Sequence, residues 1–181
     1  MSAMPAEPIE RPTDRGAAPA TGPIGIVESA AFRLGRLAPL YDGIAFLEAI
    51  RSGELPPPPI ADLLGFDIRA IDPGEVTFAL EPQEKHYNPL GMVHGGVAAT
   101  LLDTVMGCAV QTQLPAGVGY TTLDLSVRYL RPITVQTRTI LATGTVVHLG
   151  RRTASAEGRV VAEDTGKLLA TATSTLMVVE Q

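Results

Sequence analysis

The chain has 181 residues, of which 45% are hydrophobic and 18% charged, so it carries enough apolar side chains for a folded domain and is not disordered as a whole. Its formal net charge is -5 and it has no run of basic residues, which argues against a nucleic-acid partner. A single cysteine excludes an intramolecular disulfide, and three scattered histidines without paired spacing predict that no metal is bound.

The first 22 residues are dominated by proline, alanine and charged side chains and show no hydrophobic periodicity. We expect residues 1–22 to form a disordered leader, because such a composition cannot bury a core. The leader lacks the apolar centre of a signal peptide, and no stretch of the chain approaches the roughly 18 apolar residues of a membrane span. The expected location is the cytoplasm, without a membrane partner.

Residues 24–51 carry apolar side chains at helical spacings, which predicts one or two amphipathic helices. Four consecutive prolines follow at residues 56–59, and they cannot continue a helix, so we expect a stiff extended connector there. Residues 23–59 are therefore predicted to be a helical extension with a proline-rich connector. It precedes the main domain, which we place at residues 60–181.

The main domain contains one long apolar segment among several short strand-like ones. Residues 95–113 are apolar on nearly every side, which predicts a buried helix. The segments that indicate strands are residues 65–71, 75–80, 120–130, 134–148, 152–163 and 167–179. This order predicts an α+β fold, with an antiparallel sheet wrapped around one long central helix.

Alternation within residues 120–130 predicts a strand with one covered face. Leu123, Leu125, Val127 and Tyr129 are expected on that face. Thr122 and Asp124 are expected on the opposite face.

A glycine pair, Gly95 and Gly96, stands where the predicted helix begins. Free backbone N–H groups at a helix N-terminus, together with the helix dipole, suit an oxyanion or a polarised carbonyl. The alternative is structural, since glycines also allow a loop to pass close to a sheet.

Asp103 is the one carboxylate in the apolar segment at residues 97–110. Burying a carboxylate without a partner is costly, so it is either a hydrogen-bonded structural group or a catalytic base. Gly95 and Asp103 are eight residues apart, about 12 Å along a helix. One small carbonyl cannot contact both on the same helix, so a joint role predicts that Asp103 comes from a second copy of the chain, in a dimer.

The stretch from Asn88 to Asp103 resembles the PaaI-type branch of the hotdog-fold acyl-CoA thioesterases, which includes phenylacetyl-CoA, 4-hydroxybenzoyl-CoA and medium- and long-chain acyl-CoA thioesterases. The matching pattern is Asn88, a His-Gly-Gly triplet six residues later, and an acid nine residues after the histidine. The similarity continues through residues 121–125 and 129–132 and covers about residues 63–179. It implies a hotdog fold, an acyl-CoA substrate, no cofactor beyond the CoA of that substrate, and a homodimer or a homotetramer built as a dimer of dimers.

The resemblance also implies a role for each residue of the pattern. Gly95 would donate its N–H to the thioester oxygen, with Asn88 orienting or polarising the same group. Asp103 would activate the attacking water or attack directly, and the Thr122 hydroxyl would help to hold the water. His94 would line the entrance and assist the leaving thiolate, or it would only orient the loop.

Four further residues are expected to contact the substrate. Gly96 lies beside the thioester site. The turn at Gly150, Arg151 and Arg152 is where the family often meets the nucleotide phosphates of CoA, and arginines suit phosphates. The alternative is that this turn is ordinary solvated surface. The remaining histidines, His86 and His148, are expected at the surface.

Hydrolysis of an acyl-CoA thioester is the function that these residues favour. Two rivals remain open: a hotdog dehydratase or hydratase acting on an acyl thioester, and a protein that binds acyl-CoA without catalysis. The Pro-Gly helix entry usual for the former is absent here, and retention of Asp103 argues against the latter.

Overall fold

The computed structural model describes residues 30–180, without the side chains of residues 30–32. The leader expected at residues 1–22 and the first part of the extension lie outside these residues. The strands of the described part are β1 (Phe66–Asp72), β2 (Glu75–Leu80), β3 (Val118–Tyr129), β4 (Ile140–Leu149), β5 (Thr153–Ala162) and β6 (Leu168–Glu180). They form one antiparallel sheet in the order β1-β2-β4-β5-β6-β3.

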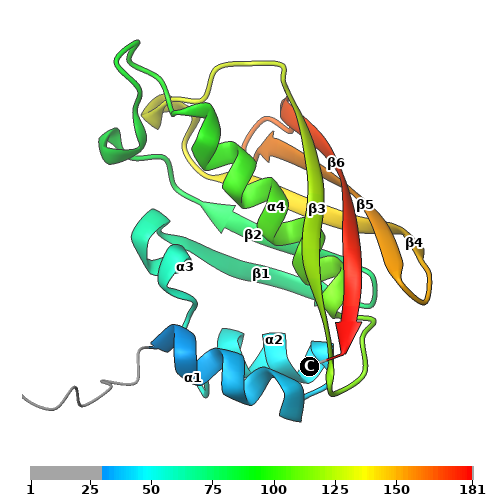
Figure 1. Cartoon of the computed structure of the whole chain (residues 1–181). Coiled ribbons are helices and arrows are strands. Elements are labelled where there is room, and N and C mark those ends of the chain that lie inside the picture. The colour runs from blue at the N-terminus through cyan, green and yellow to red at the C-terminus, as the bar shows by residue number, and fades with distance from the viewer. Residues whose placement is uncertain (1–29, 181) are drawn as a thin grey trace, which may run out of the picture.

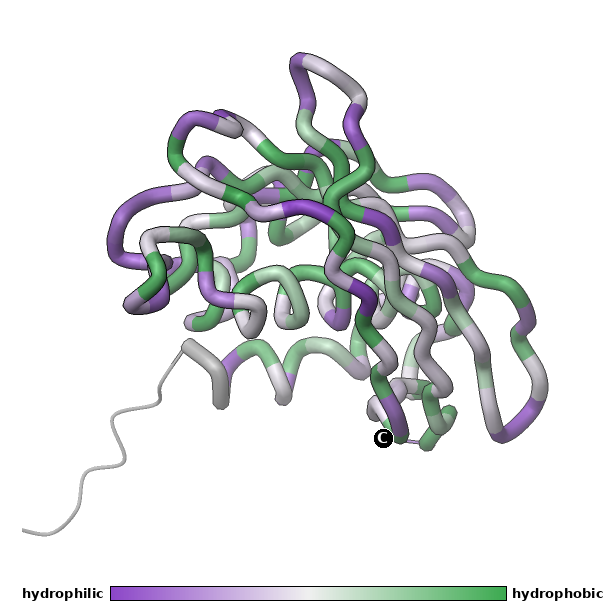
Figure 2. Tube along the Cα trace, turned by 90° about the horizontal axis from the view of Figure 1, so that it is seen from above, coloured by the Kyte–Doolittle hydropathy of each residue, from purple (hydrophilic) through white to green (hydrophobic). Residues whose placement is uncertain are grey.

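The long helix α4 (Gly95–Gln111) lies against the curved sheet and fills its concave side (Figure 1). Its most buried side chains are Leu101, Leu102, Val105 and Met106, each 0% exposed. In the hydropathy view, the hydrophilic stretches gather in the outer loops (Figure 2). A sheet wrapped around one long helix is the hotdog arrangement, so the predicted fold class is confirmed.

Two glycines on adjacent strands let α4 approach the sheet closely. Gly144 on β4 and Gly158 on β5 are cross-strand partners. A Cβ at Gly144 would collide with the helix backbone at Val105, and a Cβ at Gly158 would lie 2.9 Å from the Leu102 side chain. A larger residue at Gly144 would therefore push the helix away from the sheet, whereas one at Gly158 would first displace the side chains of Leu102 and Met106.

The expectation that α4 is buried on every side is wrong for one face. The sheet covers only one side of the helix, so a stripe on the other side stays partly exposed. The stripe consists of Ala99, Thr100, Asp103, Thr104 and Cys108. These small and polar side chains give α4 an open face, and the candidate carboxylate lies on it.

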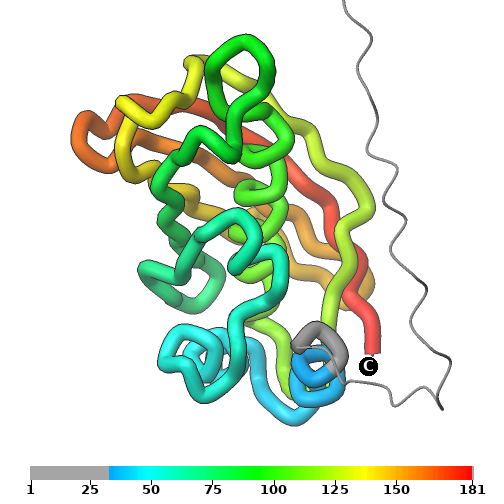
Figure 3. The backbone as a smooth tube through the Cα atoms, turned by 90° about the vertical axis from the view of Figure 1, so that its left-hand side faces the viewer, coloured from blue at the N-terminus to red at the C-terminus, as the bar shows by residue number. Residues whose placement is uncertain are grey.

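The N-terminal extension packs at the C-terminal end of α4 (Figure 3). It comprises α1 (Ala30–Leu37), a 3₁₀ turn, η1 (Ala38–Leu40), and α2 (Gly43–Ser52). Asp42 caps α2 by accepting a hydrogen bond from the Ala45 N–H at 2.9 Å. The Gly43 N–H donates to the Leu114 carbonyl at 3.0 Å, which ties the start of α2 to the loop that follows α4.

The proline run is only partly the extended connector that the sequence predicts. Pro58 is extended, but Pro59 begins a short helix, α3 (Pro59–Leu64), that the sequence analysis missed. Proline is well tolerated at the first helical position, because that residue's N–H would have no intrahelical partner. Another difference is that β4 begins at Ile140 rather than near residue 134, since a 3₁₀ turn, η3 (Val135–Thr137), comes first.

Strand β3 lies at one edge of the sheet and contains a β-bulge. Thr122 pairs with Leu176 and Asp124 pairs with Thr175, so Leu123 is the extra residue between them. A bulge interrupts the alternation of side chains. Leu123 is accordingly 55% exposed, while Thr122 turns toward α4, so the predicted faces of these two residues are wrong.

Candidate active site

Asp103 and Thr122 form the polar centre of the open face of α4. The Thr122 hydroxyl donates a hydrogen bond to Asp103 Oδ1 at 2.9 Å, between helix α4 and edge strand β3. Both side chains are only partly buried, so water can reach them. The hydroxyl fixes one carboxylate oxygen, which leaves the other oxygen free to bind or deprotonate a water molecule.

The pKa values of two neighbouring groups, the Cys108 thiol and the Tyr120 hydroxyl, are raised in part by Asp103. Desolvation by burial raises the pKa of the Cys108 thiol, and the Asp103 carboxylate adds to the effect, so that the two together bring this pKa to about 12. The pKa of Tyr120 is raised well above its ordinary value by burial, with Cys108 and Asp103 adding to the effect. Both groups therefore stay protonated at neutral pH.

The raised pKa of Cys108 gives a direct prediction. Thiol reagents attack the thiolate, so at pH 8 we expect the native protein to react with a disulfide reagent about 10³-fold more slowly than an unperturbed thiol. The measurement is the rate of thionitrobenzoate release, with the unfolded chain as the control that restores the normal rate. Native reactivity within tenfold of the unfolded chain would show that the thiol is not desolvated as described.

The N-terminus of α4 offers a free donor. His94 caps the helix, because its Nδ1 accepts a hydrogen bond from the Gly96 N–H at 2.9 Å. The first helical N–H, that of Gly95, has no acceptor among the described residues. This N–H carries a partial positive charge that the helix dipole reinforces, so it can donate a hydrogen bond to a ligand oxygen at this position.

Tyr129 was given no role by the sequence analysis, although it lies directly over this N-terminus. Its hydroxyl donates to the Gly95 carbonyl at 2.9 Å, and a Cβ on Gly95 would lie 3.0 Å from its ring. Only glycine leaves room for the ring at this height. The one sequence signal was the glycine itself, which does not reveal what packs against it.

Asn88 shapes the loop before α4. Its Oδ1 accepts hydrogen bonds from the Leu90 N–H at 2.9 Å and the Met92 N–H at 3.4 Å. The side-chain oxygen of Asn88 is thus bonded within the loop, while its side-chain NH₂ group remains available to donate hydrogen bonds. Asn88 is therefore both a loop-ordering residue and a candidate donor.

His86 is buried at 3% exposure, so its expected surface position is wrong. Its Nδ1 accepts from the Gln83 N–H at 3.1 Å, and its carbonyl accepts from the His94 N–H at 2.8 Å. Burial, with Lys85 adding to it, lowers the pKa of His86, so the ring is neutral at pH 7. This histidine supports the loop that carries His94.

The turn with Gly150, Arg151 and Arg152 is exposed and lies near the Asp103 end of the sheet. Thr153, just after it, pairs with Met177 on β6, and Met177 pairs with Thr121 on β3. Two strand spacings of about 4.8 Å therefore separate this turn from the strand that holds Thr122. Within one protomer the turn therefore lies closer to the Thr122 end of β3 than to the Tyr129 end, where Gly95 is.

Residues 30–180 contain no group of three or more histidine, cysteine, aspartate or glutamate side chains placed to hold a metal ion. In the same part of the chain, no helix has the length and apolar character that crossing a membrane requires.

Comparison with known proteins finds a match to the thioesterase superfamily over residues 90–169. A candidate esterase of Halobacterium salinarum is 37% identical over 107 residues, which cover 56% of this chain and 69% of the relative. Human acyl-coenzyme A thioesterase 13 is 30% identical over 98 residues, covering 54% of this chain and 69% of the human protein. A Streptococcus mutans protein solved with acetyl-CoA bound is 30% identical with a TM-score of 0.58, covering 64% of this chain and 90% of that one.

Proposed function

The chain belongs to the thioesterase superfamily, and from this membership we propose that it hydrolyses acyl-CoA thioesters at a site shared by two protomers. The observation that carries the proposal is the 2.9 Å hydrogen bond between Thr122 and Asp103 on the open face of α4. It holds a carboxylate where water can reach it.

The shared site follows from the length of α4. Asp103 is eight residues beyond Gly95, about 12 Å along the helix axis, so one thioester carbonyl cannot meet both from the same chain. A second protomer must supply one of the two groups. A two-fold axis then creates two equal sites.

Strand β3 is the edge that fits this pairing. Its N-terminal half carries Thr122, bound to Asp103, and its end carries Tyr129, bound to Gly95. If two β3 strands pair antiparallel with the two-fold axis near Leu125, each Thr122 comes to lie close to the partner's Tyr129. The exposed Leu123 supports this, because long edge strands with exposed apolar side chains favour pairing.

In the proposed reaction, the thioester carbonyl oxygen accepts the Gly95 N–H, assisted by the amide of Asn88. Asp103 takes a proton from a water molecule that Thr122 helps to hold, and the water oxygen attacks the carbonyl carbon. The carbon–sulfur bond breaks, the proton passes to the CoA sulfur, and the products are the free acid and CoA. His94 lies at the entrance, where its ring faces the leaving group.

CoA itself is proposed to extend toward the partner's side of the site. In the paired arrangement, the Arg151 and Arg152 turn lies near the Asp103 that completes the site. Arginines there would neutralise the nucleotide phosphates, with Gly96 leaving the helix entrance unobstructed.

The test is thiol release from a panel of acyl- and aryl-CoA esters. We expect turnover at kcat/KM of about 10⁴ M⁻¹s⁻¹ or more for the best substrate. A native chain that binds CoA esters but releases no thiol from any of them would overturn hydrolysis and leave acyl-CoA binding as the function. Formation or loss of a double bond in the acyl group would instead indicate a dehydratase or hydratase.

A further inference from the structure

An apolar cavity of about 260 Å³ lies between α4 and the helical extension. Its apolar wall includes Leu47, Ile50, Ala61, Phe66, Ile68 and Phe78. Thr104 and Cys108 of α4 form the side nearest the candidate site, within reach of the Asp103 charge that raises the Cys108 pKa. The cavity therefore adjoins the helix that carries the carboxylate.

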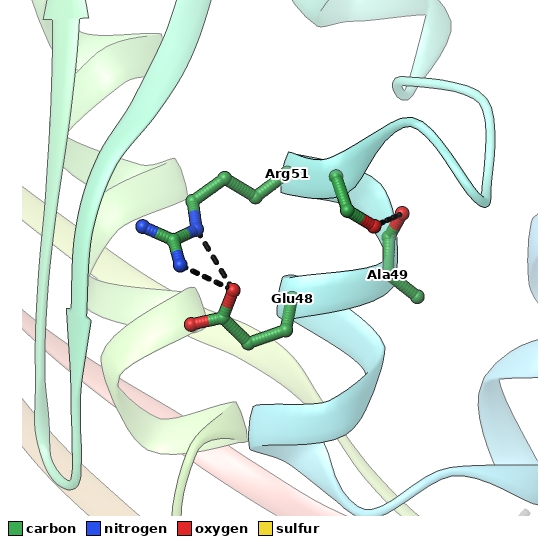
Figure 4. A network of polar contacts seen from close by, with 4 residues as sticks. Glu48, Ala49 and Arg51 are labelled. Atoms are coloured by element: carbon green, nitrogen blue, oxygen red, sulfur yellow. Dashed lines mark hydrogen bonds and ion pairs between the residues drawn. The ribbon is translucent and has the colours of Figure 1, made fainter.

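The rim of the cavity carries two exposed charged side chains, Arg51 and Asp67, whereas its interior is apolar. Arg51 lines the rim, and its guanidinium is held by Glu48 on the same helix, with Nε 2.8 Å from Oε2 (Figure 4). This pairing keeps the arginine's charge with Glu48, so its alkyl stem can cover apolar surface. A long apolar group can enter without leaving a buried charge unpaired.

The cavity continues toward the N-terminus of α4. Ile60 of α3 lines both the cavity and a shallower hollow beside His94, Gly96 and Thr100. Positions 96, 100, 104 and 108 recur every four residues and so follow one line along the helix. Because the two hollows share Ile60 as a wall, they mark a path along this line of the helix, from the glycine pair to Cys108.

This path needs no polar partner from a ligand. The Thr100 hydroxyl donates to the Gly96 carbonyl at 2.9 Å, and the Thr104 hydroxyl donates to the Thr100 carbonyl at 2.8 Å. Both hydroxyls are satisfied inside the helix. Along α4 the path can therefore accept an alkyl chain without leaving a buried hydroxyl unpaired.

We propose that this path holds the acyl chain of the substrate, so that the extension and α3 set the preferred chain length. The inference rests on the thioesterase function proposed above. Gly96 to Cys108 spans 12 residues, about 18 Å of helix. A zigzag of 1.5 Å bonds advances about 1.3 Å per carbon, so the path suits linear chains of about 12 to 14 carbons.

The volume agrees with this length. At about 30 Å³ for each heavy atom, the last five carbons of such a chain need about 150 Å³, less than the cavity provides. A single aromatic ring next to the carbonyl would stay in the shallow hollow and would not reach Ala61 or Phe66. The preferred substrate class is therefore the linear medium-to-long acyl thioester.

The test measures binding rather than turnover. The Asp103→Asn chain is titrated calorimetrically with acyl-CoA esters of 4 to 18 carbons and with phenylacetyl-CoA. We expect Kd to fall by roughly two- to fourfold per added methylene up to about 12 to 14 carbons, then level off. In the same background, Ala61→Leu fills the cavity and lowers the preference for dodecanoyl- over hexanoyl-CoA by at least tenfold.

Ala45→Leu is the matched control, because Ala45 lies on the exposed side of α2 and does not line the cavity. It should keep the native chain-length profile. Ile60→Trp is the second variant; Ile60 is 42% exposed, so it tolerates a large residue that blocks the path into the cavity. We expect it to abolish the gain in affinity beyond about eight carbons, since Ile60 stands roughly midway along the path.

Three outcomes would overturn the acyl path: a Kd independent of chain length, identical profiles for Ala61→Leu and Ala45→Leu, or tighter binding of phenylacetyl- than dodecanoyl-CoA. Thiol release by the native chain is measured in parallel. If the expected binding profile appears while the native chain hydrolyses no ester, the acyl path stands and the hydrolase proposal fails.

Discussion

Replacing Asp103 with asparagine is expected to lower kcat for acyl-CoA hydrolysis by about 10³-fold, the middle of the range for loss of a general base. The amide keeps the size of the side chain and can still pair with Thr122, but it cannot take a proton from water. Binding of the product CoA should change little. Thiol-release kinetics and calorimetry with CoA measure the two effects separately.

The matched control is Asp164→Asn, an exposed carboxylate in the turn between β5 and β6. It should retain the native rate, since it lies outside the proposed site. A rate within tenfold of native for Asp103→Asn, in a folded protein, would contradict the proposed catalytic role. Loss of CoA binding together with turnover would point instead to a structural role for the carboxylate.

Mixing two inactive chains restores activity if the site is shared. In a heterodimer of an Asp103→Asn chain and a Gly95→Pro chain, one site keeps both native groups and the other loses both. Random exchange of equal amounts makes half of the dimers mixed, so about one quarter of the native activity returns. Proline at the first helical position removes the N–H without breaking the helix. Activity is followed during subunit exchange, which a tagged chain reports.

Gly95→Ala is the control for bulk at this position. Alanine adds a Cβ 3.0 Å from the Tyr129 ring but keeps the N–H, so it separates displacement of the ring from loss of the donor. We expect it to retain more activity than proline. No recovery in the mixed dimers, with exchange confirmed, would place the whole site within one chain.

The sequence predicts the parts of the site that are local along the chain. Gly95 and Asp103 lie on one helix, so their spacing alone determines their separation and leads to the proposal of a dimer. The orientation of Thr122 could not be predicted from the alternation of side chains, because the bulge at Leu123 turns Thr122 to the inner face. That bulge depends on how β3 pairs with β6, which is a tertiary feature. Burial of His86 likewise depends on the neighbours of its loop, which no local pattern reveals.

In the N-terminal extension, too, the sequence predicts the local features and not the tertiary ones. Helical periodicity predicts helices in residues 24–51, and α1 and α2 are present in the described part. The short helix α3 was missed because its first residue is the last of four prolines, which indicate extended chain when taken together. The cavity between these helices and α4 is a tertiary feature, since its walls come from segments far apart in the sequence.

The glycines of β4 and β5 have a consequence for where natural variation can be tolerated. Gly144 and Gly158 carry no chemistry, yet they determine how deeply α4 lies in the sheet and hence the height of Asp103 above Thr122. A displacement of about 1 Å at a reacting group can cost about a hundredfold in rate. Relatives that keep every proposed catalytic side chain but have a larger residue at position 144 should therefore be poor enzymes, so this remote glycine is as informative about activity as the site itself.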